Sequence, residues 1–134
     1  MSRLQLALNV SDLEQSVKFY AQLFGAEPVK LRPGYANFAI ADPPLKLVLF
    51  ENPGAAGSIN HLGVEHAERA AVQTAIGELT AAGMLPVIEN ETECCYAVQD
   101  KAWVTAPDGE AWEVYTVLSD VPEDAPSTTC CTPA

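Results

Sequence analysis

The hydrophobic and polar positions at the start of the chain change from a strand pattern to a helix pattern. Residues 4–10 alternate with a period of two, which is typical of a β-strand and places Gln5, Ala7 and Asn9 on one face. A capping-box signal follows at residues 11–14, and apolar side chains then recur at helical spacing until Gly25. Glycine readily ends a helix, so the pattern predicts a strand followed by a helix.

The same kinds of element then follow one another twice along the chain. After the helix, apolar runs separated by turn residues predict three strands, over residues 27–31, 35–40 and 45–50. Residues 52–58, rich in Gly, Ala and Pro, have the composition of a linker. The order then begins again, with a strand over residues 59–66, a helix over 67–82, and strands over 85–89, 96–105 and 111–118.

An internal repeat explains this order. At an offset of 56 residues, Gln5 stands opposite His61, and the elements of the two halves match one by one. A βαβββ module of this size leaves one sheet face uncovered, so pairing two modules completes the core and encloses a pocket. We therefore predict one α+β domain over residues 1–118, with module one over 2–51 and module two over 59–118. Residues 119–134, rich in Pro, Ser, Thr and acidic side chains, are predicted to be a disordered tail.

Charge and composition exclude several classes of partner. The 134 residues include 18 acidic and 7 basic side chains, for a net charge of −11, which disfavours binding to nucleic acid or to an anionic membrane surface. The sequence contains no apolar run of the roughly 20 residues that a membrane span needs. The first residues lack the apolar region of a secretory signal, so we expect a cytoplasmic protein.

Three polar residues interrupt predicted strands at positions where the pattern calls for core residues. They are Gln5 and His61, in the equivalent first strands of the two modules, and Glu113 in the last strand. Each residue alone is more often a satisfied polar group or a surface residue. The equivalence of Gln5 and His61 in the repeat changes that balance, because pairing the modules brings both first strands to one cleft. A carboxylate between apolar neighbours is also costly to bury unless it is paired or bound to a cation.

Together these side chains form a plausible set of metal ligands. One imidazole, one carboxylate and one amide oxygen suit Fe(II), Mn(II), Ni(II) or Zn(II), and they leave coordination positions open for a substrate. The set is similar to the two-histidine, one-carboxylate triad of non-haem iron oxygenases, with Gln5 in place of one histidine. Since an amide is a weaker neutral ligand than an imidazole, the iron affinity should be lower.

The four cysteines form two adjacent pairs, Cys94-Cys95 and Cys130-Cys131. Neighbouring cysteines close only a small, strained ring, and neither pair has the spacing of a zinc ribbon or a thioredoxin site. Two thiols match in number the exchangeable ligands of an organic trivalent arsenical, and thiolates prefer soft partners. The alternative is that Cys94 and Cys95 are incidental free cysteines on a polar loop. The pair in the tail is either an accessory capture arm or a feature without function.

Several segments taken together resemble one protein family. Over residues 2–118 the chain resembles the vicinal-oxygen-chelate superfamily, which includes glyoxalases, bleomycin-resistance proteins and extradiol dioxygenases. Within it, the chain resembles the carbon–arsenic lyases and the related cadmium-induced proteins. The segments that carry this resemblance are RPGYANFAIA at 32–41, PPLKLVL at 43–49, NHLGVE at 60–65, CCYAVQDK at 94–101 and WEVY at 112–115.

The resemblance implies an enzyme that depends on Fe(II) and O₂ and cleaves the carbon–arsenic bond of trivalent organoarsenicals. Methylarsonous acid or a trivalent aromatic arsenical would be the substrate, and arsenite would be released. Other divalent metals, namely Ni, Mn, Co or Zn, would be able to replace iron in binding. Carried over by position, the metal ligands are Gln5, His61 and Glu113, in a cleft between the modules. The thiols that bind the substrate and take part in catalysis are Cys94 and Cys95, and the substrate site also includes Tyr96 and Lys101.

Two other functions remain open from the sequence. A non-enzymatic protein that sequesters cadmium or arsenic would use the same thiols and the acidic surface. Another reaction of the superfamily, such as isomerisation or thiol addition, would use the metal site but would give Cys94 and Cys95 no role. Either a monomer or a homodimer is expected, because two modules in one chain suffice to form the cleft.

Overall fold

The computed structural model describes residues 2–94 and 96–120. Within this part, the chain forms eight strands, two α-helices and one 3₁₀ helix. It divides into two compact units, the first made of Arg3–Leu62 and the second mainly of the residues from Gly63 onward. The boundary lies inside strand β5 (Ile59–Glu65), whereas the repeat predicted it in the linker before this strand.

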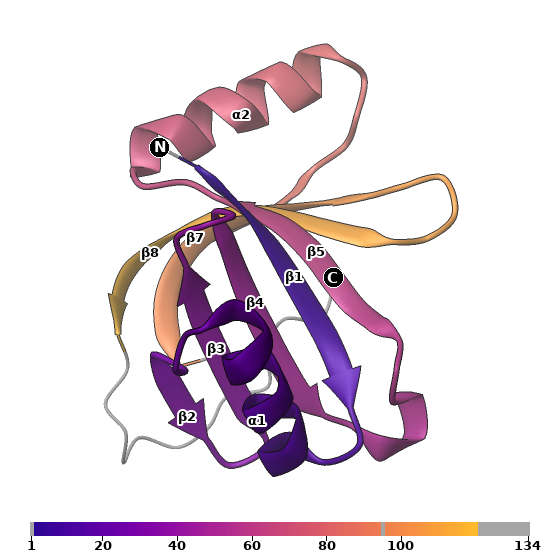
Figure 1. Ribbon diagram of the computed structural model, residues 1–134. Helices are drawn as coiled ribbons and strands as arrows, with labels where there is room; N and C mark the ends of the chain where they lie inside the picture. Colours follow the sequence, from indigo (N-terminus) through magenta and orange to yellow (C-terminus); the bar gives the residue numbers. More distant parts are fainter. Residues whose placement is uncertain (1, 95, 121–134) are drawn as a thin grey trace. The chain divides into compact units, whose positions relative to one another are not determined.

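The first unit contains the elements of module one. They are β1 (Arg3–Val10), α1 (Leu13–Phe24), β2 (Lys30–Arg32), β3 (Tyr35–Ile40), β4 (Leu45–Glu51) and the 3₁₀ helix η1 (Pro53–Ala55). The strands lie in the order β2-β3-β4-β1, with β1 parallel to β4 and the other pairs antiparallel. Helix α1 lies across one face of these strands (Figure 1).

Local sequence signals set the ends of α1. The Asp12 carboxylate accepts a hydrogen bond of 2.9 Å from the backbone N–H of Gln15, as an N-cap does. Gly25 ends the helix with φ 62°, a left-handed conformation that glycine adopts without steric cost. Both helix ends are close to those that the sequence predicted.

The two faces of β1 have different roles. Leu6 and Leu8 pack against the apolar core beneath α1, whose buried members include Phe38, Leu47 and Leu49. On the other face Gln5, Ala7 and Asn9 are buried, as the alternation predicted. The face of the sheet opposite α1 therefore carries buried polar side chains.

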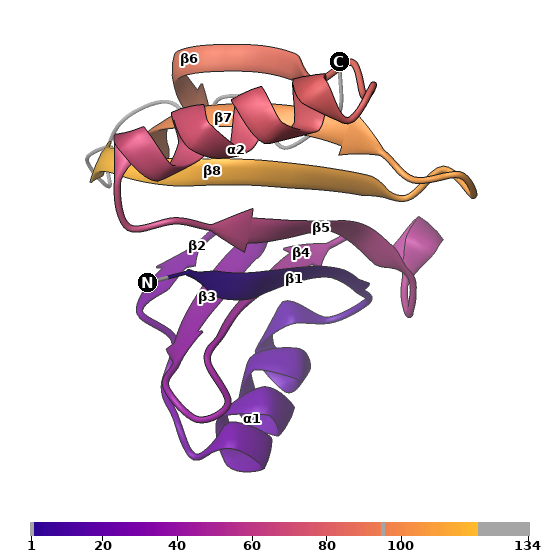
Figure 2. The ribbon, with the colours of Figure 1, turned by 90° about the horizontal axis from the view of Figure 1, so that it is seen from above.

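The second unit contains the elements of module two. After the end of β5 come α2 (Arg69–Ala81), β6 (Val87–Cys94), β7 (Ala97–Thr105) and β8 (Ala111–Asp120). The last three strands form an antiparallel sheet in the order β8-β7-β6. Helix α2 packs against β7 and β8 (Figure 2). Neither helix of the described residues has the length and apolar composition needed to cross a membrane.

The predicted α+β class and the βαβββ order of both modules are confirmed. The largest difference concerns the strand expected over residues 85–89, because β6 continues to Cys94 through the polar segment that the sequence suggested was a loop. Hydrogen bonds to β7 hold this polar segment as a strand, a tertiary effect that propensity does not report. Ser119 and Asp120, expected to begin the tail, end β8, and residues 121–134 lie outside the described residues.

Candidate functional site

Gln5 and His61 meet in the first unit, as the repeat predicted. Gln5 lies on β1 and His61 on β5, and their side chains are 3% and 2% exposed. Gln5 Nε2 lies 3.2 Å from His61 Nε2. The ring of Phe50 packs beside the imidazole, with 6.1 Å between the ring centroids. Two of the three predicted metal ligands are therefore buried and in contact.

The other nitrogen of His61 contacts a residue that the sequence did not single out. His61 Nδ1 lies 2.8 Å from Asn60 Oδ1, an oxygen that can only accept a hydrogen bond. With the Asn60 amide in this orientation Nδ1 is the donor, and a neutral imidazole then has its lone pair on Nε2, the nitrogen that faces Gln5. Adjacent strand residues ordinarily point to opposite faces, so alternation gave no signal that Asn60 contacts the ring.

Glu113, the third predicted ligand, lies on β8 in the second unit. The alternation on this strand buries Ala111, Glu113 and Tyr115 on one face. Glu113 Oε2 accepts a hydrogen bond of 3.0 Å from Lys101 Nζ on β7, and both side chains are almost fully buried, at 2% and 1% exposed. A carboxylate and an ammonium so deeply buried are costly to desolvate, and their mutual attraction offsets that cost.

Aromatic rings surround the Lys101 ammonium. Lys101 Nζ lies 5.5 Å from the centroid of the Trp103 ring and 5.9 Å from that of Tyr115, within the range of cation–π attraction. The Trp103 indole donates to Glu89 Oε1 over 3.0 Å, which fixes the ring. Trp103 itself is buried.

The predicted thiols belong to the β6–β7 hairpin. Cys94 is the last residue of β6 and pairs with Ala97 at the start of β7, while the side chain of Cys94 and the whole of Cys95 lie outside the described residues. Tyr96 follows with φ 65°, a left-handed conformation that is uncommon for a residue other than glycine. Cys130 and Cys131 also lie outside the described residues.

Lys101 was predicted to belong to the substrate site, together with the thiols. It lies four residues after Ala97 on β7, which separates the two backbone positions by about 13 Å along the strand. In the described structure its ammonium group contacts Glu113. Its predicted part in the substrate site therefore remains a prediction, as do those of Tyr96 and the two cysteines.

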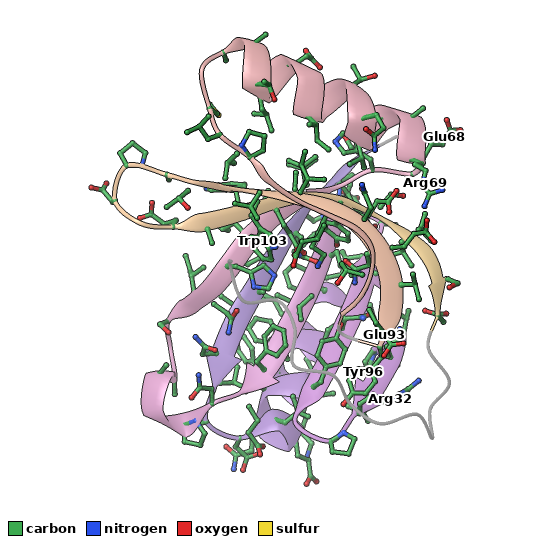
Figure 3. All side chains as sticks on the ribbon, turned by 180° about the vertical axis from the view of Figure 1, so that it is seen from behind. Arg32, Glu68, Arg69, Glu93, Tyr96 and Trp103 are labelled. Atoms are coloured by element: carbon green, nitrogen blue, oxygen red, sulfur yellow. The ribbon has the colours of Figure 1, made fainter. Side chains whose placement is uncertain are left out.

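A buried carboxylate ties the start of α2 to an irregular point in β6. The register between β6 and β7 shifts between Glu89 and Thr92, and Glu91 has φ 49°. Asp100 on β7 accepts a hydrogen bond of 2.7 Å from the Glu91 backbone N–H and forms an ion pair with Arg69, the first residue of α2. Figure 3 shows Arg69 at the start of α2, and Glu93 and Tyr96 near the β6–β7 turn.

The environment of Asp100 favours its charged form. The hydrogen bond from Arg69 lowers the pKa of Asp100 below its ordinary value, burial opposes this shift, and the Glu91 N–H adds to it. The same contact raises the pKa of Arg69. We call Arg69, Asp100 and the Glu91 backbone the β6 clamp, because together they hold the bulge three residues before Cys94.

The donor types present fit a divalent metal of borderline hardness. His61 presents a nitrogen lone pair, Gln5 an amide whose oxygen can ligate, and Glu113 a carboxylate. Among the described residues, no group of three His, Cys, Asp or Glu side chains could hold a metal by itself.

The first unit also contains a cavity of about 390 Å³ beside the start of α1. Its lining includes Asp12, Gln15 and Phe19 from the helix region, together with Asn9 and Ser58. None of the three predicted metal ligands is among the described residues that line it.

Comparison with known proteins assigns the family. The glyoxalase/bleomycin resistance protein/dioxygenase superfamily matches residues 3–114. The chain belongs to this superfamily. A superfamily member of known structure, the Mn(II)-bound glyoxalase from Novosphingobium aromaticivorans, has a TM-score of 0.61 and 21% identity, over 94% of this chain and 44% of that one. That likeness shows the fold.

Two relatives are much more similar in sequence to the present chain. A protein of Mycobacterium tuberculosis (strain ATCC 25618 / H37Rv) named cadmium-induced protein CadI is 63% identical over 120 residues, which cover 90% of this chain and 79% of the relative. A trivalent organoarsenical cleaving enzyme of Thermomonospora curvata is 57% identical over 136 residues, which cover 99% of this chain and 90% of the relative. The resemblance to both groups is confirmed.

Proposed function

We propose that this protein cleaves the carbon–arsenic bond of trivalent organoarsenicals, such as methylarsonous acid or trivalent aromatic arsenicals, and releases arsenite. The reaction depends on Fe(II) and O₂. The observation that carries the proposal is the buried contact of Gln5 with Nε2 of His61, in a chain whose strand β6 ends at Cys94, the first of two adjacent cysteines. The relatives named trivalent organoarsenical cleaving enzymes support the substrate class.

Gln5, His61 and Glu113 are the proposed metal ligands. His61 would bind the metal through the lone pair of Nε2, because Nδ1 is the nitrogen that donates a hydrogen bond to Asn60. Gln5 would bind the metal through its amide oxygen, and Glu113 would provide the negative charge that a divalent cation requires. The chemistry supplied by a bound iron would be open coordination positions and electrons for reaction with dioxygen.

The two thiols hold the substrate. Cys94 and Cys95 replace two oxygen ligands of the arsenical with sulfur, and the carbon substituent stays on arsenic. Binding through two points fixes the direction of the arsenic–carbon bond, so a step that would otherwise need several encounters becomes a positioned one. Tyr96 and Lys101 complete the substrate site, and movement of the hairpin would carry the bound arsenical to the metal and exclude water.

The proposed ligand Glu113 is paired with Lys101. Lys101 holds Glu113 in one orientation and compensates its charge in the metal-free protein. A cytoplasmic location suits this chemistry, because thiols stay reduced there.

Arsenite release tests the proposal. Reduced protein loaded with Fe(II) is incubated in air with methylarsonous acid, and arsenite is measured by chromatography with arsenic detection. We expect arsenite well above that of a metal-free control, and little from a His61→Ala variant. Arsenite at the level of the metal-free control would contradict the proposal.

Sequestration of soft metals is the second candidate. The relatives named cadmium-induced proteins and the adjacent cysteines favour it. A sequestering protein would bind methylarsonous acid equally with and without oxygen and would never alter it. Recovering the arsenical unchanged from the complex after exposure to air would therefore support this alternative over cleavage.

A further inference from the structure

A chain of hydrogen bonds leads from His61 to a backbone carbonyl in the first unit. The Asn60 amide donates from Nδ2 to Asn9 Oδ1 over 3.0 Å, and Asn9 Nδ2 donates to Ser58 Oγ over 2.9 Å. The Ser58 hydroxyl donates to the carbonyl of Ala55 over 2.6 Å. Asn9 is 6% exposed, so the middle of this chain is buried. We call Asn60, Asn9 and Ser58 the His61 relay.

The carbonyl at the end of the relay sets its direction. Because a carbonyl only accepts, the Ser58 hydroxyl must donate to Ala55, and its oxygen then accepts from the Asn9 NH₂ group. The Asn9 oxygen is thereby turned toward Asn60, and it accepts from the Asn60 NH₂ group. The Asn60 oxygen is consequently the atom that faces the imidazole.

A second donor fixes the middle of the relay. Asn52 Nδ2 lies 3.4 Å from the same oxygen of Asn9, so this oxygen has two donors around it. Rotating the Asn9 amide by 180° would place its NH₂ group against both donors. The orientation of Asn9 is therefore determined by three neighbours, and the orientation of Asn60 follows from it.

We propose that the His61 relay holds His61 in the tautomer with the proton on Nδ1. In this tautomer the lone pair is on Nε2, the nitrogen that would bind a metal. Asn60 is a positioning residue that acts through His61. This inference rests on the proposed function in one respect, which is that His61 binds a metal. It adds that residues beyond the ligands determine the affinity, as groups bound to the outer nitrogen of a metal-binding histidine ordinarily do.

The test uses three variants at two exposed asparagines. Asn60→Ala removes the oxygen that accepts from His61 Nδ1, and Asn60→Asp keeps an accepting oxygen at that position. Asn90→Ala on β6 is the matched control. The first measurement is the ¹⁵N spectrum of the histidine rings in metal-free protein at pH 8, with a His66→Gln background to assign the two rings. The second is Co(II) affinity by competition with a chelator, and thermal unfolding checks that every variant is folded.

We expect a ring protonated at Nδ1 in the wild type, in Asn60→Asp and in Asn90→Ala. In Asn60→Ala we expect a mixture of tautomers and an affinity lower by about 10–100-fold. The proposal is overturned if Asn60→Ala keeps both the wild-type ring spectrum and the affinity, or if Asn60→Asp loses as much as Asn60→Ala. A wild type that binds no Co(II) and no Fe(II) overturns the proposed function, while the ring spectra still decide the role of Asn60.

Discussion

The candidate metal ligands are buried in two different ways. Gln5 is an amide without charge, so its contact with the His61 ring adds no charge to the interior. Glu113 is charged, and its burial depends on the ammonium group of Lys101. Removing one member of the charged pair should therefore destabilise the metal-free protein far more than altering Gln5.

Lys101→Met tests this difference. The variant leaves Glu113 buried without its partner, and breaking a buried pair in this way costs about 3–5 kcal/mol. Replacing both residues, as in Lys101→Met with Glu113→Leu, should recover most of that loss, because apolar side chains of similar volume pack without a charge. Urea unfolding measures both free energies. A cost of Lys101→Met below about 1 kcal/mol would show that the pair has no such role.

Gln5 should limit the metal affinity. An imidazole is a stronger ligand for Fe(II) or Co(II) than a neutral amide, so Gln5→His should bind Co(II) more tightly than the wild type, and Gln5→Ala more weakly. Gln73→Ala, at an exposed glutamine of α2, is the control and should match the wild type. Chelator competition gives the affinities. Equal affinities in all four proteins would remove Gln5 from the metal site.

At the scale of elements, the β6–β7 hairpin connects the proposed chemistry to the fold. The strand carries five polar residues in succession before the first thiol, and its ladder to β7 is interrupted by one bulge. The β6 clamp holds that bulge through a buried carboxylate. The position of Cys94 at the strand end therefore depends on interactions with α2 and β7.

The clamp predicts a dependence of stability on pH. The folded-state pKa of Asp100 is lowered, so its contribution is complete above the ordinary aspartate pKa and is lost as the pH falls through the lower folded value. Asp100→Asn should cost about 1–3 kcal/mol at pH 7, toward the lower end because Arg69 is half-exposed. Unfolding measured between pH 7 and pH 2.5 should show this difference shrinking only near the acid end. A difference independent of pH would contradict the role of the charge.

The hairpin thiols should be separable from the metal ligands. Cys94→Ser or Cys95→Ser should abolish binding of methylarsonous acid, because a single thiolate provides only one sulfur ligand to the arsenic. Neither variant should change the Co(II) affinity. The double variant Cys130→Ser/Cys131→Ser is the control and should still bind the arsenical. Calorimetry measures both ligands. Equal loss of arsenical and metal binding would contradict this division of roles.

At the scale of the molecule, the pattern of the sequence was enough to predict the repeat and most of its elements. Period-two alternation predicted the buried face of Gln5, Ala7 and Asn9, and the offset of 56 predicted the contact of Gln5 with His61. Both depend on local periodicity and on the equivalence of positions in the two modules.

The parts that the sequence did not predict depend on tertiary contacts. Polar residues extend β6 to Cys94 because β7 pairs with them, and strand propensity alone argues against that segment. The hydrogen bond of Lys101 to Glu113 joins neighbouring strands and has no signature in sequence spacing. The contact of Asn60 with His61 likewise runs against the alternation.

One measurement tests the central claim most directly. Fe(II)-loaded protein in molar excess over methylarsonous acid is prepared without oxygen, air is then admitted, and arsenite is followed with time. Our account predicts no arsenite before air and nearly one arsenite per arsenical bound afterwards, with none from Cys95→Ser. Bound arsenical that remains intact after air is admitted would contradict the account and would leave the protein a binder of soft metals.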